Sequence, residues 1–426
     1  MGWVRVAEIV RGASPKAARV LFLAADLPWP RDGGGRIATL HILEAMCRIY
    51  DVDLVAMADP EGEPDLEYLQ SICSSVEVIA IPFTFGRHRI RQSAEFGRSM
   101  LSSEPYRLRK FRSRKFEAAV RRHLANGRYD LLHCDGFGTM PYARLAPIDL
   151  PVTTADQNVE SEIYRLARLQ ETSAIRRLLA SVEEGKLRRA ESSRLPAFDR
   201  VFVLAPDDAE ILHLLGVQRI TVLPMPAPDP WEPRQSPPAG RRIISVGSMS
   251  WYGVADGLLW FHDQVLPRVR ERVPDVEWEL VGPHAPAAIR RLGEEPGVRV
   301  TGYVEEVAPH AARARVEIVP LRIAGGVRMK LLDCLAWGLP AVSTSVGARG
   351  LEFPEGAGCF RQDDPVGFAE KVVQLLTNDR LWVRTAEAGR QFVFEHHSAA
   401  RFDEAVVSGT QAAIRHHGSR QAAVDD

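Results

Sequence analysis

The stretch "VEIVPLRIAGGVRMKLLDCLAWGLPAVST", residues 316–344, decides the fold. A β-branched apolar run leads through a glycine turn into a helical pattern, and a second β-branched run follows. This order predicts a strand, a helix and a parallel strand. Gly325 and Gly326 precede the predicted helix, and Arg328 and Lys330 lie at its start. The free N–H groups and the positive end of a helix, supplemented by two cations, are suited to bind an anion.

The anion that fits these groups is a diphosphate, which they can hold without a metal ion. An arginine binds phosphate oxygens through forked hydrogen bonds, and a lysine acts as a point charge. Asp333, one turn further on, is placed to accept hydrogen bonds from sugar hydroxyls. The alternative is a solvated helix face with a Lys330–Asp333 pair, which leaves the paired glycines unexplained.

The alternation of β-branched runs and helical patterns extends from residue 19 to about residue 380. It predicts an α/β chain with two Rossmann-like domains and mainly parallel sheets that face each other across a ligand-binding cleft. The proline-rich stretch "PMPAPDPWEPRQSPPAG" forbids a helix or a central strand, so it marks a connection. The expected parts are an N-terminal domain (1–223), a linker (224–240), a C-terminal domain (241–385), and helices that pack back and end in a frayed tail (386–426).

Composition narrows the functional classes. The chain has 426 residues and a net charge of −1, which argues against steering of the whole protein to nucleic acid. Its five cysteines are scattered and form no CxxC pair, so we expect a reducing compartment and no zinc site. The N-terminus has no apolar signal region, and no apolar run approaches the ~20 residues of a membrane span. The expected location is the cytoplasm, with peripheral contact at the inner membrane face left open.

Two weaker patterns in the N-terminal half also have simpler interpretations. The segment "GGGRIA" (33–38), with Asp53 downstream, matches a dinucleotide-binding pattern. However, seven residues separate its glycines from the preceding strand, and Asp53 begins a strand instead of ending one. The "DVD" of residues 51–53 matches a metal-binding motif, although a solvated strand start is the preferred interpretation. The glycines at 33–35 still suit an anion at a helix N-terminus, or a plain flexible turn.

The stretch "GGVRMKLLDCLAWGLPAVSTSVGARGLE" (325–352) resembles the donor-site segment of glycosyltransferase family 4, whose members have the GT-B architecture. "VGSMSWYGVADGLLWFHDQVLPRV" (246–269) is similar to another part of the C-terminal domain of that family. In the N-terminal half, "PWPRDGGGRIATLHILEAM" resembles the glycine loop of the family, and "DQNVESEIYR" resembles its "HNVES"-like strand end. The resemblance covers nearly the whole chain and is most specific in residues 242–352.

The resemblance implies transfer of a sugar from a nucleotide diphosphate sugar, with retention at the anomeric carbon and with no metal or cofactor besides this co-substrate. It implies that the diphosphate lies on Gly34, Gly35, Ser248, Arg328 and Lys330, the base near Tyr303 and Val304, the sugar on Gly325, Gly326 and Val327, and the ribose on Asp333. Arg328 and Lys330 would stabilise the leaving diphosphate. Asp135 is the third catalytic candidate, on the acceptor side.

Three departures from the family pattern stand out. Many members carry two glutamates eight residues apart, where this chain has Gly325 and Asp333. Many carry a histidine where this chain places Asp135, and the "HN" pair is "QN" at Gln157 and Asn158. The first departure is typical of a subgroup with a glycine pair and a helix lysine. The other two put the usual acceptor-side roles in doubt.

The sequence therefore predicts a retaining, metal-independent hexosyltransferase of glycan or glycoconjugate biosynthesis. A sugar-nucleotide epimerase of similar build and a non-catalytic nucleotide-sugar-binding homologue or scaffold remain alternatives. The expected acceptor is a glycan, a lipid-linked or a small molecule, and no nucleic-acid-binding motif is present. Residues 87–128 hold 13 Lys and Arg against three acids. This basic segment suggests contact with anionic lipid or an anionic acceptor, or else a solvated helix pair.

Overall fold

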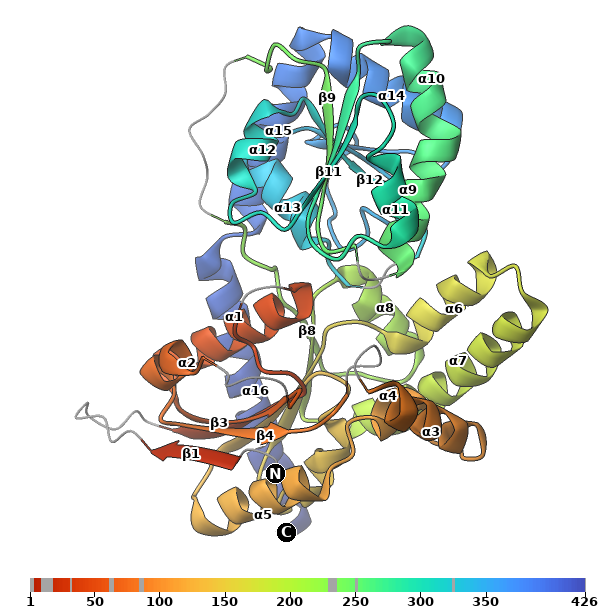
Figure 1. Ribbon diagram of the computed structural model, residues 1–426. Helices are drawn as coiled ribbons and strands as arrows, with labels where there is room; N and C mark the ends of the chain where they lie inside the picture. Colours follow the sequence, from red (N-terminus) through yellow and green to blue (C-terminus); the bar gives the residue numbers. More distant parts are fainter. Residues whose placement is uncertain are drawn as a thin grey trace. The chain divides into compact units, whose positions relative to one another are not determined.

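A computed structural model describes residues 4–8, 18–30, 33–60, 65–83, 88–228, 236–249, 252–323 and 326–425. The chain forms two units, each with its own sheet (Figure 1). Unit 1 takes the residues up to Tyr164, Leu178–Leu223 and Phe402–Asp426, and unit 2 takes Arg165–Arg177 and Pro224–Arg401. The chain thus crosses between the units not only after residue 223 but also within the helical region 164–178 and near residue 401.

The sheet of unit 1 is doubly wound. Its strands follow the order β1-β4-β3-β2-β5-β6-β7-β8, and all neighbours are parallel except β1 and β4. Strands β4 to β7 follow the Rossmann order, in which the direction of winding across the sheet reverses between β2 and β5. The strands are β1 (Val4–Glu8), β2 (Arg19–Ala24), β3 (Asp51–Ala58), β4 (Ser75–Ala80), β5 (Leu131–Asp135), β6 (Val152–Asp156), β7 (Arg200–Val203) and β8 (Ile220–Val222).

Helices of unit 1 follow from capping and apolar spacing. In α5, Ser113 accepts a hydrogen bond from the N–H of Phe116, and Phe116 and Val120 pack one turn apart in the core. The helical segments are α1 (Gly34–Ile49), α2 (Glu67–Ile72), α3 (Arg89–Met100), α4 (Tyr106–Arg109), α5 (Arg114–Asn126), η1 (Met140–Leu145), α6 (Glu160–Gln170), α7 (Ala174–Arg194), η2 (Leu195–Ala197), α8 (Pro206–Leu214) and α16 (Ala399–Asp425). The end of α6 and the start of α7 are grouped with unit 2.

The sheet of unit 2 repeats the same winding. Its order is β11-β10-β9-β12-β13-β14, with every described pair parallel and the reversal between β9 and β12. Ile243 and Ile244, successive residues of β9, belong to apolar cores on opposite faces, as expected for a sheet covered on both sides. The strands are β9 (Arg242–Val246), β10 (Glu277–Val281), β11 (Val298–Gly302), β12 (Val316–Val319), β13 (Ala341–Ser343) and β14 (Cys359–Arg361).

Helices cover both faces of this sheet, with α12, α13 and α15 on one side and α9, α10, α11 and α14 on the other (Figure 1). A π-helical turn, η3, joins α9 to α10, and Pro267 lies in the first turn of α10, where its missing N–H costs least. The segments are α9 (Tyr252–Trp260), η3 (Phe261–Val265), α10 (Leu266–Arg272), α11 (Ala287–Leu292), α12 (Ala308–Arg313), α13 (Met329–Ala336), α14 (Pro365–Thr377) and α15 (Asp379–His396).

The C-terminal helix α16 belongs mainly to unit 1. Gly409 packs on Phe202 of β7 so closely that an added Cβ would lie 2.4 Å from the ring. The His417 side chain lies 3.1 Å from the Asp199 carboxylate. α16 extends as far as Asp425, into the tail for which the sequence predicts fraying. Apolar side chains spaced along the helix, such as Phe402, Val406 and Ala413, are fully buried, and this burial stabilises its first half.

Candidate active site

The switch point of unit 2 lies where β9 and β12 run side by side. In doubly wound sheets, ligands bind outside the carboxyl ends of the strands at this point. Gly247 follows β9 directly, and Gly282 follows β10 with a positive φ of 145°. A Cβ on Gly282 would lie 2.1 Å from the carbonyl oxygen of Gly247, so only glycine permits this approach. The two loops therefore form one closely packed rim.

The predicted cations Arg328 and Lys330 lie at this rim. α13 starts at Met329, so Arg328 is its N-cap residue and Lys330 lies in its first turn. The Arg328 guanidinium donates a 2.8 Å hydrogen bond to the carbonyl of Gly326. The Lys330 side chain runs beside Gly247, where a Cβ would lie 3.8 Å from its Cδ. The structure thus brings the lysine of α13 to the end of β9, as a diphosphate site requires.

A buried glutamate in this region was not predicted from the sequence. Glu317 lies in β12 and is fully buried, and its Oε1 accepts a hydrogen bond from the N–H of Val246 at 3.2 Å. Its Oε2 has no hydrogen-bond partner among the described residues. Burial raises the pKa of Glu317 to about 8, while the positive charge of Lys330 opposes the rise. The acid within the apolar run "VEIVPL" is the signal for this site in the sequence, although a single acid is also compatible with an ordinary strand.

Burial and a neighbouring positive charge lower the pKa of Lys330, whereas burial raises the pKa of Glu317. Removal from water lowers the pKa of Lys330, the nearby Arg328 lowers it further, and Glu317 raises it. Burial also raises the pKa of Asp333 to about 7. The switch point therefore contains one lysine and two acids with shifted pKa values, which is typical of functional sites and also of buried ion pairs.

The remaining predicted donor residues of unit 2 surround the same sheet edge. Ser248 follows Gly247, and Gly326 and Val327 precede α13. Tyr303 follows β11 and is 76% exposed, whereas Val304 packs against the small apolar core beneath the rim. An exposed aromatic ring beside the site is available to stack on a flat ligand. Gly325 lies outside the described residues.

The switch point of unit 1 lies between β2 and β5 and contains Asp135. This residue ends β5 and is 2% exposed. Its Oδ2 accepts hydrogen bonds from Thr39 Oγ1 at 2.5 Å and from Gln157 Nε2 at 3.2 Å. Its Oδ1 lies 3.9 Å from Nε2 of His133 and has no hydrogen-bond partner among the described residues. Thr39, which the sequence did not single out, ties Asp135 to α1.

The predicted glycines Gly34 and Gly35 begin α1 in the same unit. A Cβ on Gly35 would lie 3.2 Å from Gln157 Oε1, whereas nothing lies within 4 Å of one on Gly34. Gly35 therefore lies next to the Asp135 network, and Gly34 leaves open space at the helix start. The structure thus groups Gly34, Gly35 and Asp135 in unit 1, and the other predicted residues in unit 2.

Asp53 cannot serve as the ribose-binding acid of a dinucleotide site. It is 1% exposed and is the third residue of β3, near the amino end of the strand and opposite the carboxyl ends. Arg19, Ser75 and Tyr129 all donate hydrogen bonds to its carboxylate. Both the dinucleotide interpretation of residues 33–53 and the metal-binding interpretation of 51–53 therefore lose their key ligand.

Asp156, the residue before Gln157, belongs to a group of buried acids with Glu160 and Glu191. Asp156 ends β6, and burial together with the charges of Glu191 and Glu160 raises its pKa well above the usual value. Burial also raises the pKa of Glu191 to about 7. Arg107 forms an ion pair with Glu160. Within the described residues, no group of three or more His, Cys, Asp or Glu has an arrangement that would hold a metal ion.

Two models of known protein families match this chain, one in its N-terminal half and one in its C-terminal half. Residues 240–378 match the family "Glycosyl transferases group 1", and residues 33–227 match "Glycosyl transferase 4-like domain". An uncharacterized 44.6 kDa protein in the cps region of Klebsiella pneumoniae is 22% identical over 376 residues, which are 85% of this chain and 92% of that protein.

Solved structures share the fold. Sucrose-phosphate synthase from Thermosynechococcus elongatus has a TM-score of 0.66 and 16% identity, covering 96% of this chain and 100% of that one. HepE of Anabaena in complex with UDP-glucose has a TM-score of 0.60 and 12% identity, covering 93% and 100%. The architecture is thus the GT-B fold. Among the described helices, none is both long and apolar enough to cross a membrane.

Proposed function

Because this chain belongs to the group 1 glycosyltransferases, we propose that it moves a sugar from a nucleotide diphosphate sugar to an acceptor hydroxyl, with retention and without a divalent metal. The observation that carries the proposal is the placement of Lys330 and Arg328 at the switch point of unit 2, beside the end of β9. HepE, which has the same fold, was solved with UDP-glucose. That complex supports a nucleotide sugar as donor.

In the proposed reaction, the bond from the anomeric carbon to the diphosphate oxygen breaks through an oxocarbenium-like state. The acceptor oxygen bonds to the same face of that carbon, and the acceptor proton passes to the leaving diphosphate. Negative charge grows on the diphosphate in the transition state, so preorganised cations stabilise it most there. Lys330, Arg328 and the N–H groups at the start of α13 supply this stabilisation, which gives them the role that a metal ion has in other enzymes.

The rest of the donor is assigned to the rim of unit 2. The ribose lies near Asp333, whose pKa is raised to about 7 by burial. The base lies near Tyr303, whose ring is exposed. Ser248, Gly326 and Val327 contact the diphosphate and the sugar. Asp135, with Thr39 and Gln157, belongs to the acceptor side.

The relative in a cps region supports a role in polysaccharide biosynthesis, with a glycan or lipid-linked acceptor. The basic segment 87–128 is then a surface for an anionic partner. Much of its charge is compensated within unit 1, for example by the ion pairs of Arg122 with Glu77 and of Arg109 with Glu95. Contact with a membrane therefore depends on the charges that remain.

A screen of nucleotide sugars by thermal shift, followed by turnover assays, tests the proposal. We expect one class of donor to raise the melting temperature and to be hydrolysed or transferred. NMR of the product should show that the α or β configuration of the donor is retained. Stabilisation by a donor without turnover of any acceptor favours the non-catalytic homologue. No response to any nucleoside diphosphate or its sugars contradicts the donor site.

A further inference from the structure

A pocket of about 890 Å³ opens within unit 1. Val152 begins β6 and Phe198 precedes β7, so its floor lies toward the amino ends of these strands. Asp135 and Asp156, in contrast, end β5 and β6 at the carboxyl ends. The pocket is therefore a separate feature from the switch point of this sheet.

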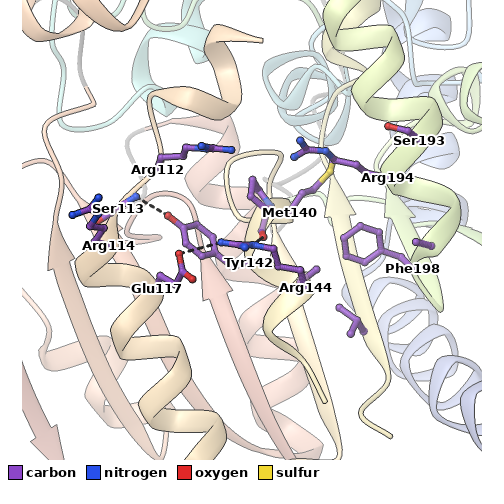
Figure 2. A pocket seen from close by; sticks show the side chains of 14 residues that line it. Arg112, Ser113, Arg114, Glu117, Met140, Tyr142, Arg144, Ser193, Arg194 and Phe198 are labelled. Carbon is purple, nitrogen blue, oxygen red and sulfur yellow. Dashed lines mark hydrogen bonds and ion pairs between the residues drawn. The ribbon is translucent and has the colours of Figure 1, made fainter. Parts of the chain in front are cut away.

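Four arginines from four different segments line the pocket (Figure 2). Arg112 precedes α5, Arg114 begins α5, Arg144 lies in η1, and Arg194 ends α7. Glu117 is the one acid among the lining residues. A concave site lined by an excess of one charge attracts ligands of the opposite sign.

The carboxylates near the pocket do not neutralise these arginines one for one. Glu104 is shared by Arg112 at 2.9 Å and Arg194 at 3.9 Å, and also pairs with Arg109 at 3.7 Å. Arg114 has no ion pair among the described residues. Arg194 is partly buried, which lowers the pKa of its guanidinium. Several guanidinium groups therefore have hydrogen-bonding capacity left for a ligand.

The floor of the pocket is apolar. Met140, Val152 and Phe198 line it, and Tyr142 lies against the arginines with its hydroxyl accepting a 2.9 Å hydrogen bond from the N–H of Ser113. Figure 2 shows Arg144 extending between Tyr142 and Phe198. Guanidinium groups bind phosphate through forked hydrogen bonds. An apolar floor beneath them suits the hydrocarbon or ring part of the same molecule.

We propose that this pocket binds an organic phosphate, with the phosphate on Arg112, Arg144 and Arg194 and an apolar part on the floor. The phosphate comes from one of two sources: the headgroup of a lipid or a soluble phosphorylated molecule. The pocket is a second anion site, distinct from the donor site of unit 2, and its existence does not depend on the proposed transferase activity.

A matched pair of variants tests this site. Arg144 and Arg121 both pair with Glu117, at 3.1 Å and 2.9 Å, and their side chains are 66% and 61% exposed. Only Arg144 lines the pocket. Arg144→Gln and Arg121→Gln thus remove the same charge from the same partner, and equal melting temperatures will confirm that both fold.

The first measurement is calorimetric titration of the full chain with inorganic pyrophosphate at low salt. Binding at the predicted donor site contributes equally to both variants and cancels in their comparison. We expect Arg144→Gln to weaken the additional binding about ten-fold, the usual value of a charge-assisted contact, and Arg121→Gln to change it less than two-fold. Equal effects of the two substitutions would overturn the proposal.

The second measurement distinguishes the sources of the phosphate. The same proteins are pelleted with vesicles of phosphatidylcholine alone and with vesicles that contain phosphatidylglycerol. Loss of pelleting with the anionic vesicles in Arg144→Gln but not in Arg121→Gln assigns the pocket to a lipid headgroup. Pyrophosphate binding that depends on Arg144 without vesicle binding assigns it to a soluble phosphate. Equal losses of pelleting in both variants would show that vesicle binding depends only on general surface charge, and this result would contradict the proposal.

Discussion

The carboxylate of Glu317 in β12 accepts a hydrogen bond from the backbone N–H of Val246, the last residue of β9. This bond crosses the point where the sheet of unit 2 reverses its winding. The next residue, Gly247, lies beside the side chain of Lys330, since a Cβ built on this glycine would be 3.8 Å from Cδ of the lysine. A buried acid, a glycine and a lysine therefore lie together at the switch point of unit 2, and the charge of Glu317 acts on Lys330.

Glu317→Gln should move the alkaline limb of the activity profile to lower pH. The negative charge of Glu317 raises the pKa of Lys330. Glutamine keeps an acceptor for the Val246 N–H but removes that charge, so Lys330 loses its proton at a lower pH and binds the diphosphate less well. The measurement is kcat from pH 6 to 10 for both proteins. An unchanged alkaline limb would show that Lys330 does not depend on Glu317.

The same variant should change how stability depends on pH. The folded-state pKa of Glu317, about 8, lies above its ordinary value of 4.5. The folded protein therefore keeps a proton that the unfolded chain loses, and the stabilisation present below pH 4.5 is lost as the pH rises toward 8. We expect the melting temperature of the wild type to fall more steeply between pH 5 and 8 than that of Glu317→Gln. Parallel curves would mean that Glu317 is ionised throughout this range.

Asp135 is expected to affect turnover more than donor binding. Asp135→Ala removes the acceptor of the bonds from Thr39 and Gln157, and it should lower transfer while the affinity for the nucleotide stays roughly unchanged. Asp135→Asn preserves the size of the side chain and separates loss of charge from loss of packing. Asp135→His is expected to be tolerated, since histidine is frequent at this position in the family. Normal turnover of the alanine variant would make Asp135 a structural residue and direct attention to His133.

Docking of α16 on unit 1 can be tested with two glycines of the same helix. A Cβ on Gly409 would lie 2.4 Å from the ring of Phe202, whereas nothing lies within 4 Å of one on Gly418. Gly409→Ala should destabilise the protein by about 1–3 kcal/mol through overpacking. Gly418→Ala should be neutral or stabilise by up to about 1 kcal/mol, because alanine favours the helix. Chemical denaturation measures both, and equal effects would contradict the packing of α16 on β7.

The sequence predicted the alternation of strands and helices and the mainly parallel sheets, but β1 lies outside the span of residues 19–380 in which this alternation was expected. The strands β8 and β14 have three residues each, too few for a pattern that identifies a strand. The distribution of the chain between the units was also hidden, because the docking of α16 depends on a close approach to Phe202 that no local pattern encodes. Glu317 was overlooked for a related reason: one acid in a β-branched run does not disturb the strand pattern, and its importance arises from a neighbour in β9.

Lys330 and Arg328 provide the decisive test of the proposed mechanism. Charge accumulates on the diphosphate in the transition state, so removing one preorganised contact should lower kcat by ~10²–10³, by analogy with oxyanion-hole donors. Lys330→Ala should therefore lose turnover while staying folded, and Arg328→Lys should lose activity because a point charge cannot reproduce a forked contact.

The competing interpretation of Lys330 is a purely structural role beside the buried Glu317, because the burial of Lys330 and Asp333 does not fit the solvated surface pair that the sequence also allowed. Loss of the positive partner of a buried acid lowers stability and leaves the turnover of the folded protein intact. Measuring kcat and the melting temperature on one preparation of Lys330→Ala separates the two. Addition of EDTA to the wild type checks the metal-independent mechanism, because cations supplied by the protein should keep kcat unchanged. Normal turnover of Lys330→Ala, or loss of wild-type activity that added Mg²⁺ restores, would remove the role assigned to these residues.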